Sequence, residues 1–347
     1  MGASNSDLKK TAEFSLVSEL FGEYLQKRGL VCDPSQLLIR ELGGGVSNVV
    51  LLVEGPQGRW VAKQSLGKLR VEDDWRSSRN RIFREAAAIE CLSPVLGSAV
   101  PIVVHVDREN YLYIMTAAPE HSVMWKQLLL NGEVGTEIAI AAGKLLAKII
   151  NASRADAGFK SQFSDQTIFD ELRIDPYYRT TATRHPDIAE SLKQLIQDSC
   201  KIQTALVHGD YSPKNMLVRD RQILLIDFEV VHWGDPAFDS AFLLNHLMLK
   251  SFHRPQDADL YLQAARACWH ALKTDVGEPS EGGFESMTVR HLGGLMLARI
   301  DGKSPVEYIR DDGIKARVRK VAKQILVERP RSLDEAFVQV ERGTALK

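Results

Sequence analysis

The residues of this sequence that could do chemistry gather between residues 206 and 244, in LVHGDYSPKNMLVRDRQILLIDFEVVHWGDPAFDSAFLL. Two short apolar runs in this stretch each lead to an acidic residue. Leu206–Val207 lead to Asp210, and Ile223–Ile226 lead to Asp227. Because both runs have the composition of strands, we expect the two carboxylates to lie at one edge of a small sheet.

Carboxylates held in this way suit metal-assisted transfer of a phosphoryl group. That reaction needs a carboxylate to orient and deprotonate the attacking hydroxyl group, and hard oxygen ligands to bind Mg²⁺ against the phosphates. Asp210 is the candidate for the first role, and Asn215 and Asp227 are the candidates for the second. An asparagine supplies an oxygen ligand without adding a negative charge.

The motif His208-Gly209-Asp210-(x)4-Asn215, followed by Ile226–Glu229 (Ile-Asp-Phe-Glu) and Gly234–Asp239, resembles that of the aminoglycoside phosphotransferase and choline kinase family. The resemblance implies an α+β, protein-kinase-like fold of two lobes, with a small antiparallel sheet in the N-terminal lobe and a mainly helical C-terminal lobe. It also implies an ATP-dependent phosphotransferase that moves the γ-phosphoryl group to a hydroxyl of a small molecule. Bound Mg²⁺, with ATP as co-substrate, is part of that expectation.

The stretch Leu37–Val53 is expected to form a strand, a glycine turn and a second strand. Gly43, Gly44 and Gly45 would let the backbone approach a ligand closely, and Ser47 adds a polar group. The resemblance implies that this turn covers the nucleotide. A plain hairpin turn is the alternative interpretation.

The resemblance also implies an ion pair that holds the ATP phosphates. Lys63 lies in an expected third strand, and Glu85 lies in an expected helix over Arg79–Leu92 that Pro94 helps to end. In the family, such a lysine contacts the phosphates and such a glutamate steadies it. Nearby acidic residues compete for the glutamate role: Glu72, Asp73, Asp74 and Glu90.

The boundary between the lobes is expected at a hinge over Thr116–Pro119, after two further strands. Residues 1–116 would form a nucleotide-binding lobe, and residues 117–347 a catalytic and acceptor-binding lobe. Apolar spacing predicts helices in the second lobe. They are expected at Glu133–Ile150, Pro186–Ile202, Ala241–Phe252, Asp257–Leu272, Met287–Ile300, Ile314–Val327 and Leu333–Val340.

Other residues of the motif are expected to have supporting roles. His208 is expected to order its loop by hydrogen bonds, and Asp239 to bind backbone amides of that loop. Lys214 could neutralise charge on the moving phosphoryl group or point to solvent, while Glu229 could bind a second magnesium ion through water or cap a turn. Gly209 stands where protein kinases carry an arginine, which favours a small-molecule substrate.

The sequence is compatible with several classes of small molecule as the phosphoryl acceptor. Asp175–Tyr178 and Gly234–Asp239 look similar to methylthioribose kinases and favour a sugar-type acceptor, although Phe228 stands where that family has proline. An aminoglycoside would need an acidic cleft, for which Asp170, Glu171, Asp175, Glu278 and Glu281 are candidates. Choline would need an aromatic cage, for which Tyr177, Tyr178, Trp233 and Trp269 are candidates. A non-catalytic nucleotide-binding module is the alternative of another class. The resemblance places the segment Phe169–Tyr178 beside the acceptor, and a surface loop is the alternative interpretation of that segment.

The composition of the chain argues against some kinds of binding partner. The chain has 347 residues, 44% of them hydrophobic and 26% charged, with a net charge of −1, so we expect no nucleic-acid partner and no membrane association. The four cysteines form no metal or redox motif. They are Cys32, Cys91, Cys200 and Cys268, and we expect them to be buried free thiols of a cytoplasmic protein that is a monomer or a homodimer.

Overall fold

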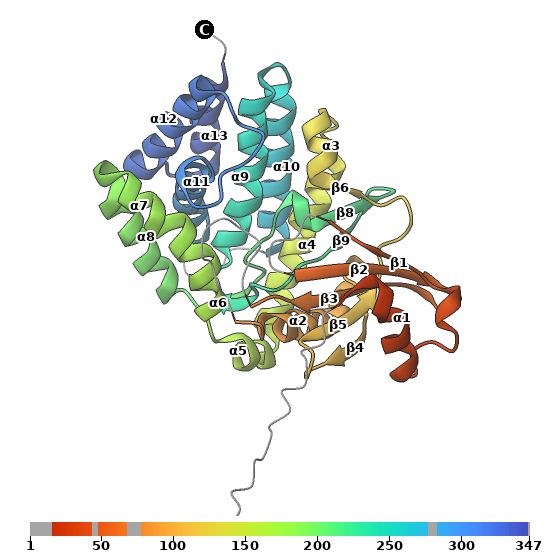
Figure 1. The fold of residues 1–347 in the computed structure, drawn as a ribbon. Helices are drawn as coiled ribbons and strands as arrows, with labels where there is room; N and C mark the ends of the chain where they lie inside the picture. The colour runs from red at the N-terminus through yellow and green to blue at the C-terminus, as the bar shows by residue number, and fades with distance from the viewer. Residues whose placement is uncertain (1–15, 44–47, 68–77, 277–282, 346–347) are drawn as a thin grey trace, which may run out of the picture. The chain divides into compact units, whose positions relative to one another are not determined.

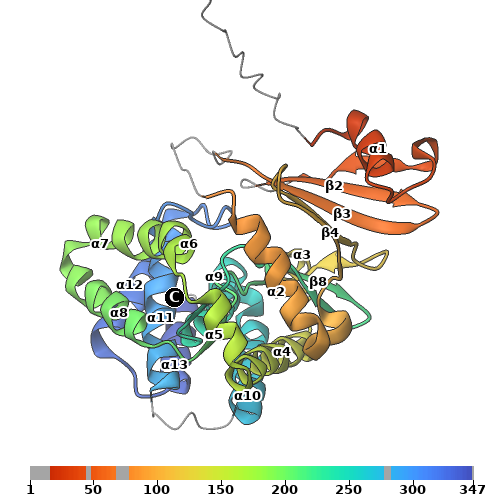
Figure 2. The ribbon, with the colours of Figure 1, turned by 90° about the horizontal axis from the view of Figure 1, so that it is seen from below.

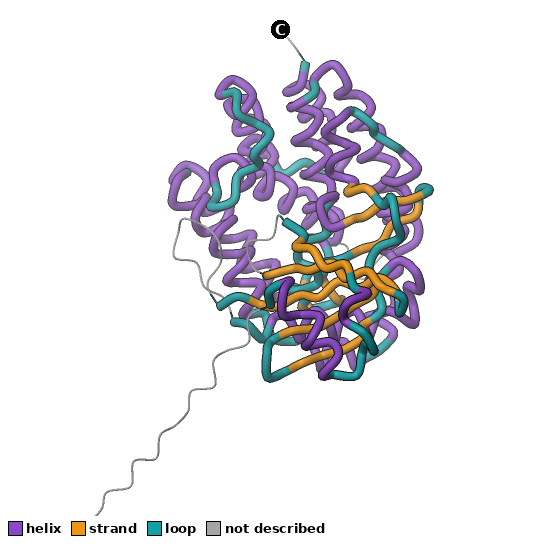
Figure 3. The backbone as a smooth tube through the Cα atoms, turned by 45° about the vertical axis from the view of Figure 1, so that its right-hand side comes forward, coloured by secondary structure: helices purple, strands orange, loops and turns teal. Residues whose placement is uncertain are grey.

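A computed structural model describes residues 16–43, 48–67, 78–276 and 283–345 of the chain. The chain divides into two compact units (Figure 1). Unit 1 comprises Met1–Phe83 and Val103–Ala117, and unit 2 comprises Arg84–Ile102 and Ala118–Lys347. Figure 3 shows that the strands are found mostly in unit 1 and that helices make up most of unit 2. The expected α+β composition is therefore confirmed.

Unit 1 is built on an antiparallel sheet with the strand order β1-β2-β3-β5-β4 in its described residues. The strands are β1 (Leu38–Glu41), β2 (Asn48–Gly55), β3 (Gly58–Ser65), β4 (Val103–Asp107) and β5 (Leu112–Thr116). Helix α1 (Ser18–Lys27) buries Phe21 and Leu25 in one apolar cluster with sheet residues such as Leu51 and Val53. The expected strand pair on either side of the glycine turn is confirmed, and its strands β1 and β2 pair in antiparallel register.

Helix α2 (Arg81–Leu96) begins in unit 1 and continues in unit 2. The sequence predicts a helix here that Pro94 helps to end, but Pro94 lies inside the helix. The missing N–H of a proline removes one helical hydrogen bond. The buried side chains of Leu92 and Leu96 flank Pro94 and hold the last turn in place.

Seven helices of unit 2, the one that begins at Thr136 and all those from Ala189 onward, match spans expected from apolar spacing, whereas the others were not predicted. Unit 2 is built mainly from helices. They are α3 (Trp125–Asn131), α4 (Thr136–Ala155), α5 (Ala157–Phe163), α6 (Thr167–Phe169), the π-helical segment Asp170–Arg179, α7 (Thr180–Arg184), α8 (Ala189–Lys201), α9 (Ala237–His253), α10 (Ala258–Val276), α11 (Phe284–Asp301), α12 (Asp312–Glu328) and α13 (Leu333–Thr344). Short 3₁₀ turns precede or join some elements. They lie at Pro34–Gln36, Gly97–Ala99, Pro186–Ile188, Pro213–Asn215 and Pro255–Asp257.

The core of unit 2 is centred on α9, which is buried along nearly its whole length. Helices α10 and α11 pack on it, and α4 lies beside α10 (Figures 1 and 2). Gly143 of α4 allows this close approach, because a Cβ atom there would lie 2.3 Å from the carbonyl oxygen of Cys268. This helical core carries the small strands that hold the acidic residues of the motif.

Those strands form two separate small sheets rather than one. β7 (Ala205–Val207) pairs with β10 (His232–Gly234), whereas β6 (Val123–Met124), β8 (Met216–Arg219) and β9 (Gln222–Leu225) form a sheet in the order β6-β8-β9. The expectation that the two carboxylates share one sheet edge is therefore wrong. β9 pairs with β8 across a tight hairpin, whereas β7 pairs with β10 and β6 pairs with β8 across longer stretches of the chain.

Two further expectations concern cysteines and membranes. The four thiols are free, but only Cys268 is buried, while Cys32 and Cys200 are exposed, so the expected burial is wrong for most of them. None of the helices in the described parts of the chain combines enough length with enough apolar character to cross a bilayer.

Candidate active site

The loop that carries Asp210 is shaped by a glycine and a buried carboxylate. Gly209 has a φ of +76°, and a Cβ atom there would lie 2.8 Å from the carbonyl oxygen of Val230, so only glycine fits. The Asp239 carboxylate, in the first turn of α9, accepts hydrogen bonds from the amides of His208 at 2.6 Å and Gly209 at 2.9 Å. The predicted structural role of Asp239 is confirmed.

His208 orders the same loop as a neutral ring. Its Nδ1 accepts a hydrogen bond from the amide of Asp210 at 3.1 Å, so its Nε2 must be the atom that carries the proton and donates to the carbonyl of Ile226 at 3.1 Å. Burial lowers the pKa of His208 to about 4 and keeps the ring neutral at physiological pH. The predicted ordering role is thus confirmed, and the ring links the two small sheets.

Asp210 is held between two cations. Its Oδ2 lies 3.1 Å from Nη2 of Arg173 and 2.8 Å from Nζ of Lys214. Burial alone would raise the pKa of Asp210, but the positive charges of Lys214 and Arg173 outweigh it and the pKa is lowered. Asp210 is therefore ionised and can only accept a hydrogen bond or a proton from a substrate.

Arg173 is a site residue that the sequence analysis missed. Besides Asp210 it binds the carbonyl oxygens of Gly209 and Leu172, each at 2.6 Å, and its side chain is buried. It lies in the π-helical segment Asp170–Arg179, which the sequence analysis left open between an acceptor-side element and a surface loop. The segment is helical and largely buried. Its mixture of acidic, basic and aromatic residues indicated that the segment could belong to the site. Apolar spacing could not show which of its side chains points inward.

Asn215 and Asp227 come together at the base of the β8–β9 hairpin. The amide of Ile226 donates to the carbonyl of Asn215 at 3.0 Å, and Nδ2 of Asn215 donates to the carbonyl of Asp210 at 2.9 Å. Asp227 has a φ of +71°, a left-handed backbone conformation that is rare outside glycine and is often found at functional sites. Its charge acts on both Asp210 and Lys214.

This donor set suits a magnesium ion bound partly by phosphates. Asn215 uses its Nδ2 for the loop, and among the described residues its Oδ1 has no hydrogen-bond partner and can bind a cation. No group of three or more His, Cys, Asp or Glu side chains in the described residues forms a complete protein cage for a metal. Magnesium typically takes one or two protein ligands and leaves the rest to water and phosphate oxygens.

The two accessory candidates differ in exposure. Lys214 pairs with Asp210 although its side chain is 47% exposed, so it is not simply directed to solvent. Glu229 is buried and its charge acts on Arg173. Phe228, between Asp227 and Glu229, packs its ring 4.5 Å from the ring of His208, which ties both carboxylates to the loop of Asp210.

The residues expected to bind the nucleotide lie mainly in unit 1. Lys63 is buried on β3, and Gly43 follows β1. Glu85 is buried on α2 within unit 2, so its ion pair with Lys63 stays a prediction. Gly44, Gly45 and Ser47 lie outside the described residues, as do the competitors Glu72, Asp73 and Asp74.

Two of the five acidic residues proposed for a cationic acceptor form ion pairs with cations of the protein. Asp170 pairs with Arg179 at 2.7 Å, and Asp175 pairs with Lys303 at 2.8 Å. Glu278 and Glu281 lie outside the described residues.

The aromatic candidates for a choline cage are buried against different neighbours. Tyr178 bonds His291, the indole of Trp233 bonds the carbonyl of Gln203, Trp269 stacks on Phe284, and Tyr177 stacks on Phe242.

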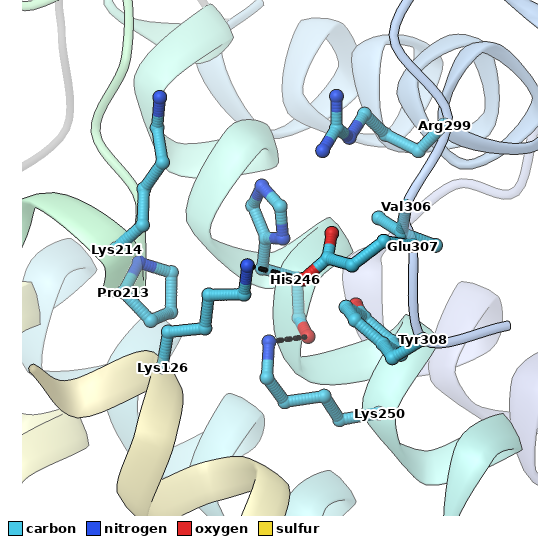
Figure 4. A pocket seen from close by; sticks show the side chains of 9 residues that line it. All are labelled: Lys126, Pro213, Lys214, His246, Lys250, Arg299, Val306, Glu307 and Tyr308. Carbon is cyan, nitrogen blue, oxygen red and sulfur yellow. Dashed lines mark hydrogen bonds and ion pairs between the residues drawn. The ribbon is translucent and has the colours of Figure 1, made fainter. Parts of the chain in front are cut away.

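A basic cavity lies next to Asp210 within unit 2 (Figure 4). Four of its lining side chains are Lys126, Lys214, Lys250 and Arg299, and its one carboxylate is Glu307. Lys214 belongs both to this cavity and to the Asp210 ion pair. The sequence analysis missed the other three cations, because they come from α3, α9 and α11 and no sequence spacing relates them.

Comparison with known proteins gives a family and a fold. The family described as "Phosphotransferase enzyme family" matches residues 38–273. Methylthioribose kinase 2 of Oryza sativa subsp. japonica is 27% identical over 251 residues, which cover 64% of this chain and 59% of that protein. Methylthioribose kinase of Escherichia coli O45:K1 (strain S88 / ExPEC) is 25% identical over 256 residues, which cover 64% of this chain and 60% of that protein. The match thus spans less than two thirds of the length of either relative.

A solved structure shows the fold. The structure of choline kinase from Cryptosporidium parvum Iowa II superposes with a TM-score of 0.53 at 14% identity, covering 94% of this chain and 95% of that chain. The chain therefore has the kinase-like fold that the sequence resemblance implied.

Proposed function

Because the chain belongs to the phosphotransferase enzyme family, we propose that it is an ATP-dependent small-molecule kinase. The reaction transfers the γ-phosphoryl group of ATP to a hydroxyl group of a small acceptor. The observation that carries this proposal is the pairing of Asp210 with Arg173 and Lys214, beside Asn215 and Asp227. Such an arrangement positions a hydroxyl group and neutralises charge, which is most of what phosphoryl transfer requires.

In the proposed step, the hydroxyl oxygen bonds to the γ-phosphorus as the bond from that phosphorus to the bridging oxygen of ADP breaks. The proton of the hydroxyl passes to a carboxylate oxygen of Asp210. Since the pKa of Asp210 is lowered, this carboxylate is a weak base that mainly orients the hydroxyl and takes the proton late. Lys214 lies where it can offset negative charge on the moving group.

The residues that would bind the nucleotide and the metal follow from the same proposal. Oδ1 of Asn215 and the carboxylate of Asp227 would hold Mg²⁺, and Glu229 is an accessory candidate. When bound, the ion would neutralise phosphate charge and hold the phosphates in line. Lys63, steadied by Glu85, and the turn Gly43–Gly45 with Ser47 would position the phosphates, so that unit 1 would serve the nucleotide and unit 2 the acceptor.

A sugar-type acceptor, such as methylthioribose, is the second candidate for the substrate of this proposed kinase. Both relatives described above are named methylthioribose kinases, and the segment Asp175–Tyr178 looks similar to theirs. A choline-type cage finds no support in the separate packing of the four aromatic candidates. The free thiols are compatible with a reducing compartment, and a cytoplasmic location is part of the proposal.

The proposal is tested by ATP consumption with Mg²⁺ over a panel of aminoglycosides, methylthioribose and other sugars, choline and hydroxy acids. We expect turnover with one class, and a loss of at least about 10³-fold in kcat for Asp210→Asn with Mg–ATP affinity unchanged. Lys323→Met is the control, because Lys323 pairs with Asp187 away from the catalytic loop. A wild-type protein that binds no Mg–ATP would refute the kinase assignment. Tight Mg–ATP binding without turnover on any acceptor would favour the non-catalytic binding module.

A further inference from the structure

The basic cavity contains more positive than negative charge. Nζ of Lys126 lies 2.5 Å from Oε1 of Glu307, and Lys214 is paired with Asp210, so these two cations are compensated. In the part of the chain that the structure describes, neither Lys250 nor Arg299 forms an ion pair with a carboxylate. Two positive charges in one cavity are therefore left without a counter-charge from the protein.

Lys250 is the most costly of these charges because its side chain is fully buried. Its Nζ donates to the carbonyl of His246 at 3.2 Å and lies 5.1 Å from the ring centre of Tyr308. Burial, together with the charges of Lys126 and Arg299 and against an opposing effect of Glu307, lowers the pKa of Lys250 to about 7. An ammonium group that is buried without a counter-charge is destabilising and gives up its proton easily, and a bound anion would stabilise its charged form.

Other polar groups around the cavity lack partners as well. Among the described residues, Nε of Arg299 and the hydroxyl of Tyr308 are buried without any hydrogen bond. The His246 ring lies between Lys214, Lys126 and Arg299 (Figure 4), and burial together with Lys250 and Arg299 lowers its pKa well below the usual value. The neutral ring of His246 adds no charge to the cavity, and the surrounding cations add to the effect of burial on its pKa.

We propose that this cavity binds an oxyanion, a phosphate ester or a carboxylate, carried by the acceptor whose hydroxyl group meets Asp210. The anion would pair with Lys250 and Arg299, and Tyr308 would donate a hydrogen bond to it. Lys214 connects this subsite to the Asp210 carboxylate. The inference rests on the proposed function. It disfavours cationic acceptors, because the cavity would repel them. It also disfavours neutral sugars, because a neutral acceptor leaves Lys250 and Arg299 without a counter-charge.

The direct test measures binding of three probes by calorimetry at low salt and pH 6.5: glycerol 3-phosphate, glycerate and glycerol. We expect wild-type protein to bind at least one anion and not glycerol, and the tighter of the two anions identifies the group. Lys250→Met is expected to weaken that binding at least tenfold. Glu307→Gln removes the one carboxylate of the cavity and should tighten the binding. Lys323→Met serves as the matched control and should bind as wild type does.

Folding of the variants gives an independent readout. Because Lys250→Met replaces an unpaired buried cation with an apolar side chain of similar shape, we expect its melting temperature to rise while anion binding is lost. A purely structural role of Lys250 would lower the melting temperature instead. Anions that bind equally to wild type and Lys250→Met, or no better than glycerol, would overturn the inference.

Three further outcomes separate this inference from the proposed function. If saturating Mg²⁺ and a non-hydrolysable ATP analogue abolish anion binding, the cavity holds a nucleotide phosphate and the acceptor subsite is wrong. If turnover occurs on a neutral or cationic acceptor and is unaffected by Lys250→Met, the kinase assignment stands and the subsite is refuted. If no Mg–ATP binds but Lys250→Met still loses the anion, the subsite stands and the kinase assignment fails.

Discussion

At the residue scale, the protonation state of Asp210 depends on a side chain from a distant helical turn. Arg173 contributes its guanidinium from the π-helical segment and also braces the carbonyl of Gly209. The lowered pKa of Asp210 means that its ionised form stabilises the fold above the ordinary pKa of an aspartate. That stability is lost as the pH falls through the lower pKa of the folded state.

Replacing Arg173 by methionine should therefore raise the pKa of Asp210, because its burial stays and one cation is lost. We expect the acidic limb of the pH profile of kcat/KM to move about one unit to higher pH, with a loss of about 3 kcal/mol in the free energy of unfolding. Lys214→Met should move the limb in the same direction with a stability loss below about 1 kcal/mol, since Lys214 is 47% exposed. An unchanged acidic limb in Arg173→Met would contradict this account.

The backbone at Gly209 offers a second test at this scale. Gly209→Ala places a Cβ atom 2.8 Å from the carbonyl oxygen of Val230 at a φ of +76°, so we expect a loss of about 2–4 kcal/mol in urea unfolding and a large drop in kcat. Gly97→Ala is the control, because Gly97 has a φ of +55° with no atom within 4 Å of the added Cβ. Its loss should be about 1 kcal/mol with kcat unchanged. Equal losses in both variants would show that the contact with Val230 is unimportant.

At the scale of elements, the β8–β9 hairpin holds two groups of the site at its base. Its strands pair from Met216 to Leu225, and its turn is formed by Asp220 and Arg221, both with positive φ, at 49° and 64°. Two successive residues with positive φ define a turn that suits the twist of the strands and favours Asp-Gly. Arg221 therefore carries backbone strain that a glycine would relieve.

Arg221→Gly is expected to stabilise the protein by about 0.5–1 kcal/mol, measured as a higher urea midpoint with an unchanged slope. Gln222→Gly, one residue further on in β9, should have the opposite effect, because a glycine in a strand weakens it. Because the turn lies far along the hairpin from Asn215 and Asp227, kcat should not change in Arg221→Gly. A destabilised Arg221→Gly variant would show that the arginine side chain stabilises the turn.

At the scale of the whole molecule, the proposed kinase needs groups from both compact units. Lys63 belongs to unit 1, whereas Asn215 and Asp227 belong to unit 2. A ligand that binds only the folded state stabilises that state by an amount set by its concentration and affinity. Thermal unfolding with and without the nucleotide is therefore a measure of the complete site.

We expect Mg–ATP at about 100 times its Kd to raise the free energy of unfolding by about 2.7 kcal/mol. Removing magnesium with a chelator, or replacing Lys63 by methionine, should remove most of that increase. Lys250→Met should keep it, because the basic cavity is proposed to bind the acceptor and not the nucleotide. An increase of equal size without magnesium would contradict the roles proposed for Asn215 and Asp227.

The sequence by itself determined the fold class and the longer helices of this protein, and it predicted the chemistry that we propose. The spacing of His208, Asp210, Asn215 and Asp227 predicted the loop that we propose to be catalytic, because these residues follow one another along a short stretch and their geometry depends on local turns. The longer helices of unit 2 followed from apolar spacing, whereas the π-helical segment Asp170–Arg179 and the helices of seven residues or fewer did not. The hydrogen-bonding roles of His208 and Asp239 were also predicted from their place in the motif and were confirmed.

The tertiary structure alone decided which distant residues join that loop. Arg173 lies in a segment whose spacing gave no sign of an inward-pointing arginine, and the strands that precede Asp210 and Asp227 belong to different sheets. Lys126, Lys250 and Arg299 come from three helices that meet only when the core of unit 2 packs. Electrostatic energy depends on distance in space and on burial, and a linear sequence records neither. For that reason the chemistry could be predicted from the sequence, while the charge that the acceptor should carry could not.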